Sequence, residues 1–169
     1  MVGGSIAEVY LFVKVGFNYL YFFDKLTIKK VVPMIKEENL PKVSFDDMNI
    51  VHLEEVAIIN ELLTSIENIN ETKTITEILE KLLKHMQEHF SYEENMLKNN
   101  GFGMFDIHRN DHNRIMGETR MAYMNWRNFQ DRDNLKEFIE NDFIEWLKLH
   151  IQAMDSVAAD FLNNLKENR

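Results

Sequence analysis

Residues 89–112, HFSYEENMLKNNGFGMFDIHRNDH, decide the fold of this 169-residue chain. They contain a His-x-x-x-Glu pair, His89 and Glu93, and a His-x-x-x-His pair, His108 and His112, on either side of an Asn-Asn-Gly-Phe-Gly break. Residues four apart project from the same face of an α-helix, and a glycine after a polar pair commonly ends a helix. The stretch therefore predicts two successive helices, each with a pair of polar side chains on one face.

Apolar residues recur every three or four positions over four long segments, which predicts four amphipathic helices. The helices are expected at about 45–66, 74–99, 106–127 and 133–165. Both prolines precede them, so no later residue must break a helix. Short polar links favour antiparallel neighbours. The sequence therefore predicts an all-α protein, an antiparallel up-down-up-down four-helix bundle over residues 44–169 with an N-terminal extension over residues 1–43.

Two of the predicted helix starts carry capping signals. Ser44 and Asp47 form a Ser-x-x-Asp pair before the first helix, and Thr74 and Glu77 form a capping box at the second. In such boxes the hydroxyl accepts a hydrogen bond from a backbone N–H that the helix leaves unpaired. We expect Ser44 and Thr74 to be N-caps.

Composition excludes several classes of function. The net charge is −9, which argues against a nucleic-acid partner because phosphate binding needs a basic face. The chain has no cysteine, which removes disulfides, thiolate zinc sites and iron–sulfur clusters. Any metal must therefore be held by nitrogen and oxygen atoms. Because no signal-peptide pattern is found either, a cytoplasmic location is expected.

The N-terminal extension contains an apolar and aromatic segment, residues 6–23, which is interrupted by Glu8, Lys14 and Asn18. A membrane-spanning helix needs about 20 mainly apolar residues with few charges, so a membrane span is not favoured. The alternatives are an accessory helix or hairpin that covers the bundle, and translated sequence upstream of a native start at Met34.

Five of the six histidines fall on the inward stripes of the predicted helices. A buried imidazole needs a polar partner, and two imidazoles on one face gain little from each other without a metal ion. The candidate metal ligands come from all four helices: His52, His89, Glu93, His108, His112, His150 and Asp155. His85 lies at the flank of its stripe and is predicted to be partly solvated or to support the site from outside.

These seven candidate ligands fit two metal ions bridged by two carboxylates. Five imidazoles are too many for one catalytic zinc, which takes three protein ligands. Imidazole and carboxylate without thiolate suit iron, manganese or zinc. The alternative is a helical bundle that is rich in histidine and binds no metal.

His150 and Asp155 are five residues apart, a spacing that an ideal α-helix does not bring to one face. Five steps of 100° leave the two side chains about 140° apart. A π-helical bulge brings residues i and i+5 together. We therefore predict such a distortion between Leu147 and Asp155.

The order of these motifs resembles the hemerythrin family over about residues 44–165. The resemblance rests on a first-helix histidine followed by His-x-x-x-Glu, His-x-x-x-His and His-x-x-x-x-Asp, and on the phrases His89-Phe90, Glu93-Glu94-x-Met96 and Trp146-Leu147-x-x-His150-Ile151-x-x-x-Asp155. One departure is that His52 precedes His89 by 37 residues, a longer interval than compact members of the family have. The resemblance implies two iron ions joined by an oxo or hydroxo bridge.

The resemblance also implies a role for each side chain. His108, His112 and His150 would hold one iron, His52 and His89 would hold the other, and Glu93 and Asp155 would bridge the two. The second iron would keep an open position where dioxygen binds, against an apolar wall that includes Leu147 and Ile151. No further acid or base is expected beside that open position.

Two functions remain open on this evidence. Reversible binding of dioxygen, for storage, delivery or sensing, is favoured by the set of five histidines and two carboxylates. The alternative is a di-iron enzyme or stress protein that reduces peroxide or nitric oxide, or that supplies iron for iron–sulfur cluster repair. The repair proteins resemble this fold but carry fewer histidines and more glutamates.

Overall fold

The computed structural model describes residues 22–24, 27–29, 35–68 and 71–167. Backbone contacts divide the chain into two units, Met1–Met34 and Ile35–Arg169.

The N-terminal unit contains a short antiparallel hairpin. Strand β1 (Phe22–Asp24) pairs with β2 (Thr27–Lys29), with Phe23 opposite Ile28. The predicted apolar segment at 6–23 lies outside the described residues except for its end in β1. Among the described residues, no helix is long and apolar enough to cross a membrane.

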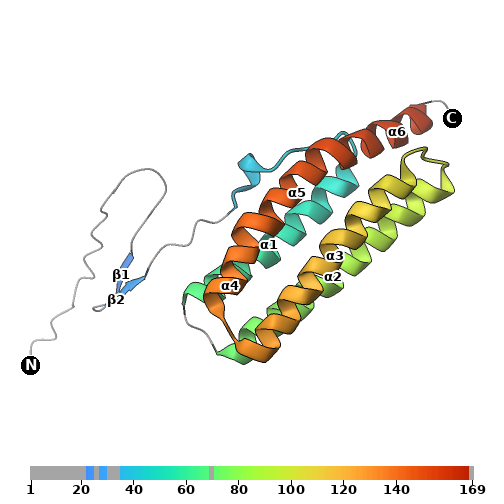
Figure 1. The fold of residues 1–169 in the computed structure, drawn as a ribbon. Helices are drawn as coiled ribbons and strands as arrows, with labels where there is room; N and C mark the ends of the chain where they lie inside the picture. Colours follow the sequence, from blue (N-terminus) through green and yellow to red (C-terminus); the bar gives the residue numbers. More distant parts are fainter. Residues whose placement is uncertain (1–21, 25–26, 30–34, 69–70, 168–169) are drawn as a thin grey trace, which may run out of the picture. The chain divides into compact units, whose positions relative to one another are not determined.

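The second unit is all-α and consists of four long helices packed antiparallel, as predicted (Figure 1). The first three are α1 (Asp46–Glu67), α2 (Thr72–Asn99) and α3 (Phe105–Phe129), and the 3-10 turn η1 (Glu37–Asn39) precedes them. The fourth is one continuous helix that alternates between α and π geometry: α4 (Arg132–Glu137), η2 (Phe138–Phe143), α5 (Ile144–His150), η3 (Ile151–Asp155) and α6 (Ser156–Glu167).

Apolar side chains fill the bundle where the four helices face each other. Burying one such side chain stabilises the fold by about 1.5–3 kcal/mol. Together, these apolar side chains can offset the cost of burying polar side chains in the same bundle. The fully buried members include Ile59, Leu62, Leu79, Leu82, Met86, Ile115, Ile139 and Phe143.

The start of α1 differs from the predicted cap. Ser44 makes no capping bond and instead donates its hydroxyl to Asp160 at 2.7 Å. The segment before α1 is instead fixed by Asn49. The side-chain amide of Asn49 accepts a hydrogen bond from the Val43 N–H at 2.9 Å and donates one to the Val43 carbonyl at 2.8 Å. The Ser44–Asp47 cap was therefore a wrong prediction, because a partner distant in sequence takes the hydroxyl.

The capping box predicted at the start of α2 is also wrong, whereas the predicted end of that helix is confirmed. α2 begins at Thr72, which leaves Thr74 inside the first turn. The Thr72 hydroxyl contacts the Gln130 side chain at 3.2 Å and ties the helix start to the end of α3. At the other end, Gly101 adopts a φ of 73°, a conformation that glycine reaches without steric strain.

Candidate metal centre

The structure brings together all seven side chains that the sequence suggested as ligands. They lie on α1, α2, α3 and the fourth helix, and none is more than 6% exposed. They are His52, His89, Glu93, His108, His112, His150 and Asp155. Each helix therefore contributes polar groups to one buried cluster.

Three imidazoles converge at the interface of α3 with the fourth helix. The His108 and His112 rings, one helical turn apart, have centroids 4.5 Å apart. The Nε2 atoms of His112 and His150 lie 3.0 Å apart. Ligand atoms of these histidines, Glu93 and Asp155 all lie within 4.8 Å of one another, a spacing that one metal ion can span.

Two further imidazoles face the same carboxylates from α1 and α2. The His52 and His89 ring centroids are 5.4 Å apart. Nε2 of His52 lies 3.0 Å from Oδ2 of Asp155, and Nε2 of His89 lies 3.5 Å from Oε2 of Glu93. These histidines therefore form a second group, which meets the first at Asp155 and at Oε2 of Glu93, the oxygen that also lies 3.6 Å from Nε2 of both His108 and His112.

Asp155 divides its two carboxylate oxygens between the two groups of histidines. Oδ2 faces His52, whereas Oδ1 lies 3.0 Å from Nε2 of His150 and 3.3 Å from Nε2 of His108. Such a division is what a carboxylate that bridges two metal ions requires.

The π-helical segment η3 places Asp155 in this position. It spans Ile151–Asp155 and directly follows His150, which confirms the predicted distortion. Because π geometry brings residues i and i+5 to one face, the His150 imidazole and the Asp155 carboxylate both reach the cluster. A second π segment, η2, was not predicted.

Several of the central atoms make close contacts without hydrogen-bond geometry. Among the described residues, Nε2 of His52, His89 and His108 and both carboxylate oxygens of Glu93 and Asp155 lack a hydrogen-bond partner. Buried polar groups of native proteins are nearly always hydrogen-bonded, so an unpaired set of this size needs another partner. Nitrogen and oxygen donors without thiolate fit iron, manganese or zinc. The residues present therefore fit a metal site.

Comparison with known proteins agrees with this geometry. The family described as the hemerythrin HHE cation binding domain matches residues 43–162. The chain belongs to the hemerythrin family. A bacteriohemerythrin from Aquifex aeolicus (strain VF5) is 24% identical over 131 residues, which cover 78% of this chain and 99% of that protein. No solved structure matches the chain.

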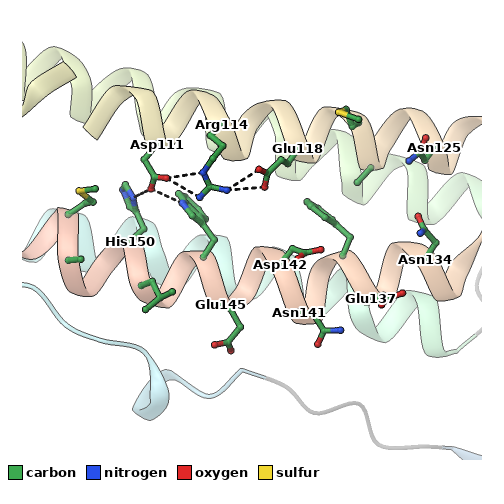
Figure 2. A pocket seen from close by; sticks show the side chains of 17 residues that line it. Asp111, Arg114, Glu118, Asn125, Asn134, Glu137, Asn141, Asp142, Glu145 and His150 are labelled. Carbon is green, nitrogen blue, oxygen red and sulfur yellow. Dashed lines mark hydrogen bonds and ion pairs between the residues drawn. The ribbon is translucent and has the colours of Figure 1, made fainter. Parts of the chain in front are cut away.

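Two carboxylates outside the predicted set contact the Nδ1 atoms of candidate ligand histidines. Oδ2 of Asp111 lies 2.7 Å from Nδ1 of His150 and also accepts from the indole N–H of Trp146 at 2.8 Å (Figure 2). Oε1 of Glu94 lies 3.2 Å from Nδ1 of His112. Acceptors at Nδ1 fix the tautomer that leaves Nε2 for a metal.

The Asp111 carboxylate belongs to an open groove between α3 and the fourth helix (Figure 2). Arg114 reaches both Asp111, at 2.9 Å, and Glu118, at 3.0 Å. Hydrogen bonds from the His150 imidazole, opposed by partial burial, hold the pKa of the Asp111 carboxyl below its ordinary value, and Trp146 and Arg114 add to this. Asp111 therefore stays ionised as an acceptor for His150.

A third carboxylate outside the predicted set contacts His89 from α1. Glu55 on α1 is fully buried. Its Oε2 lies 3.1 Å from Nδ1 of His89 and 3.9 Å from Nε2 of His85. His85 is 15% exposed, in agreement with its predicted place at the flank. Glu55 was not among the site residues predicted from the sequence. Its spacing of three residues from His52 is the feature that could have indicated it, because residues three apart share a helix face.

In the metal-free site the buried imidazoles and carboxylates stabilise each other's charges. Burial lowers the pKa of His89, but contacts with Glu55 and Glu93 outweigh burial and raise the pKa to about 10. Burial likewise lowers the pKa of His108, while Asp155 and Glu93 raise it to about 9. A metal ion that binds these imidazoles must displace their protons.

Aromatic and aliphatic side chains enclose the cluster. The Phe90 ring stacks on His112 with centroids 3.9 Å apart, and the Trp146 ring lies 4.8 Å from His150. Leu147 and Ile151, predicted as the wall of an oxygen pocket, are both buried on the fourth helix beside His150. The wall itself stays a prediction.

Proposed function

We propose that this protein is a non-haem di-iron protein that binds dioxygen reversibly, for storage, delivery or sensing. The observation that carries the proposal is the divided Asp155 carboxylate, whose two oxygens face separate groups of histidines. One metal ion would need only one of these groups.

We assign the ligands as two unequal sets. His108, His112 and His150 would hold one iron, His52 and His89 the other, and Glu93 and Asp155 would bridge them. The second iron then has fewer protein ligands and an open position for a small molecule. When bound, the two irons supply the electrons that dioxygen takes up and returns.

The chain's own contribution is to keep this reaction reversible. Leu147 and Ile151 are buried beside the ligands, and an apolar wall disfavours charge separation and the release of reduced oxygen species. The similarity to bacteriohemerythrin over nearly its whole length supports a family role rather than a new one.

A second candidate function is reduction of peroxide or nitric oxide, or a supply of iron for iron–sulfur cluster repair. One observation for an enzyme is the buried Glu55, which adds a carboxylate next to His89, but it faces Nδ1 and not the Nε2 side of the ring. The five-histidine set still favours reversible binding.

The test is optical and starts from iron-loaded protein with two irons per chain by metal analysis. Charge-transfer bands should develop in air, bleach under argon and return when air is readmitted. Irreversible decay with consumption of peroxide would favour the enzyme instead. One zinc per chain, with no iron bound, would refute the di-iron centre.

A further inference from the structure

Glu55 is a buried acid whose position the ligand set does not explain. It lies on α1, three residues after His52, and is fully buried. Burying an ionised carboxylate costs several kcal/mol unless hydrogen bonds and charges compensate it. Compensation comes first from the 3.1 Å approach of Oε2 to Nδ1 of His89, and the more distant imidazoles of His85 and His52 add to it. The His89 imidazole is therefore the group on which Glu55 acts.

The two nitrogens of His89 point in different directions. Nδ1 faces Glu55, whereas Nε2 lies 3.5 Å from Oε2 of Glu93 on the metal side of the ring. An imidazole that donates its Nδ1–H to a carboxylate is held in the tautomer whose Nε2 lone pair is free for a metal. The same contact restrains rotation of the ring.

The two groups of histidines differ in the carboxylates that contact their Nδ1 atoms. On the three-histidine side, Glu94 serves His112 and Asp111 serves His150, and both carboxylates are more than 20% exposed. On the other side, Nδ1 of His52 has no hydrogen-bond partner among the described residues. Within the part of the chain that the structure describes, Glu55 is thus the one carboxylate that supports a ligand of the open metal.

We propose that Glu55 is a positioning residue for the metal ion that has the open position, an inference that rests on the di-iron function proposed above. Its carboxylate accepts the Nδ1–H of His89, directs Nε2 to the metal and makes the imidazole a stronger donor. His85 contacts Glu55 from the outer side at 3.9 Å and is not itself a ligand.

The test compares three variants of the full chain. Glu55→Leu removes the acceptor with little change of volume, and Glu55→Gln keeps an oxygen acceptor but removes the charge. Glu54→Gln, at the exposed neighbouring position, is the matched control for charge. Each variant is loaded with Fe²⁺ under argon in competition with a chromogenic chelator, and circular dichroism verifies the fold.

We expect Glu55→Leu to weaken binding of one of the two Fe²⁺ ions by about 10–100-fold, the usual effect of removing such a partner, and to leave the other ion unchanged. Glu55→Gln should lose less than Glu55→Leu, and Glu54→Gln should match the wild type. Equal affinities in Glu55→Leu and the wild type, or an equal loss at both ions, would overturn the proposal.

A second measurement uses Zn²⁺-loaded protein, which is diamagnetic. In nitrogen-correlated NMR spectra, the Nδ1–H of His89 should be protected from exchange with water in the wild type and in Glu55→Gln, and exposed to exchange in Glu55→Leu. A third bound Zn²⁺ that is lost in His85→Ala would instead make Glu55 and His85 ligands and refute the positioning role. This result does not depend on dioxygen, so failure of the oxygen-binding function leaves it intact.

Discussion

Replacing His52 by leucine tests the proposed centre at the candidate ligand that α1 contributes. His52 lies 3.0 Å from Asp155, and its side chain is almost completely buried. After the change, Asp155 keeps its contacts with His108 and His150. Loss of one of the three imidazoles that face this buried carboxylate should lower the unfolding free energy of the metal-free protein by about 1–3 kcal/mol, less than loss of the whole partner set of a buried charge.

Metal binding should respond selectively to the same change. The three-histidine group and both carboxylates remain within 4.8 Å of one another, so one iron should still bind. The second iron would keep only His89 and the two bridging carboxylates. Loss of a ligand should cost more than the roughly 10–100-fold that loss of a supporting partner costs. The expected iron content of His52→Leu is therefore one per chain instead of two.

The assay loads iron without oxygen, removes free metal on a desalting column and measures iron per chain. His85→Leu is the matched control, because it removes the same chemical group from the flank of the cluster, and it should keep two irons. Two irons in a folded His52→Leu variant would show that His52 is not a ligand. Loss of both irons would show that the two groups do not bind independently.

Four further outcomes are expected. Asp111→Leu should weaken the three-histidine iron by about 10–100-fold in chelator competition. In denaturant titrations, the metal-free protein should be most stable between about pH 4.5 and 6.5. Folding lowers the pKa of Glu93 from 4.5, so the stability that its charge contributes is lost as the pH falls below this range. Folding raises the pKa of His89 from 6.5 to about 10, so the stability that its charge contributes is lost as the pH rises above the range. Gln130→Gly should raise the unfolding free energy in the same titrations by at most about 0.5 kcal/mol, because relief of the left-handed φ of 52° is partly offset by loss of the exposed contact with Thr72. Deletion of Gln152 should preserve iron loading.

The helices and the pairs of polar residues four apart could be predicted because both depend on local geometry. The 3.6-residue repeat fixes which side chains share a face, so His108 and His112 are brought together by any α-helix that contains them. The helix starts depend on distant partners instead. Ser44 bonds to Asp160, 116 residues away, and no local pattern contains that information.

The supporting carboxylates were missed for the same reason. Asp111 serves His150 across 39 positions, and Glu55 serves His89 across 34. Each choice depends on how the helices are rotated against one another, which the periodicity of one helix does not give. Of the two π segments, η3 could be predicted because His150 and Asp155 mark it chemically, and η2 carries no such pair.

The π segment η3 behaves as one residue inserted into an α-helix, and the deletion of Gln152 tests this interpretation. Gln152 is exposed within η3. Its deletion leaves the histidine and the aspartate four apart, about 40° from each other on a regular α-helix, so both should still reach the metal ions. Iron per chain should stay at two, and the regained regular hydrogen bonds should not lower the unfolding temperature.

Deletion of Leu149 is the matched control, because Leu149 is also exposed but lies in the regular helix α5. Its loss rotates His150 by about 100° relative to the preceding turn and should abolish binding at the three-histidine group. If both deletions lost iron while remaining helical, the extra residue would do more than set the rotational positions of His150 and Asp155 around the helix axis. The π geometry would then itself hold the Asp155 carboxylate between the two groups of histidines.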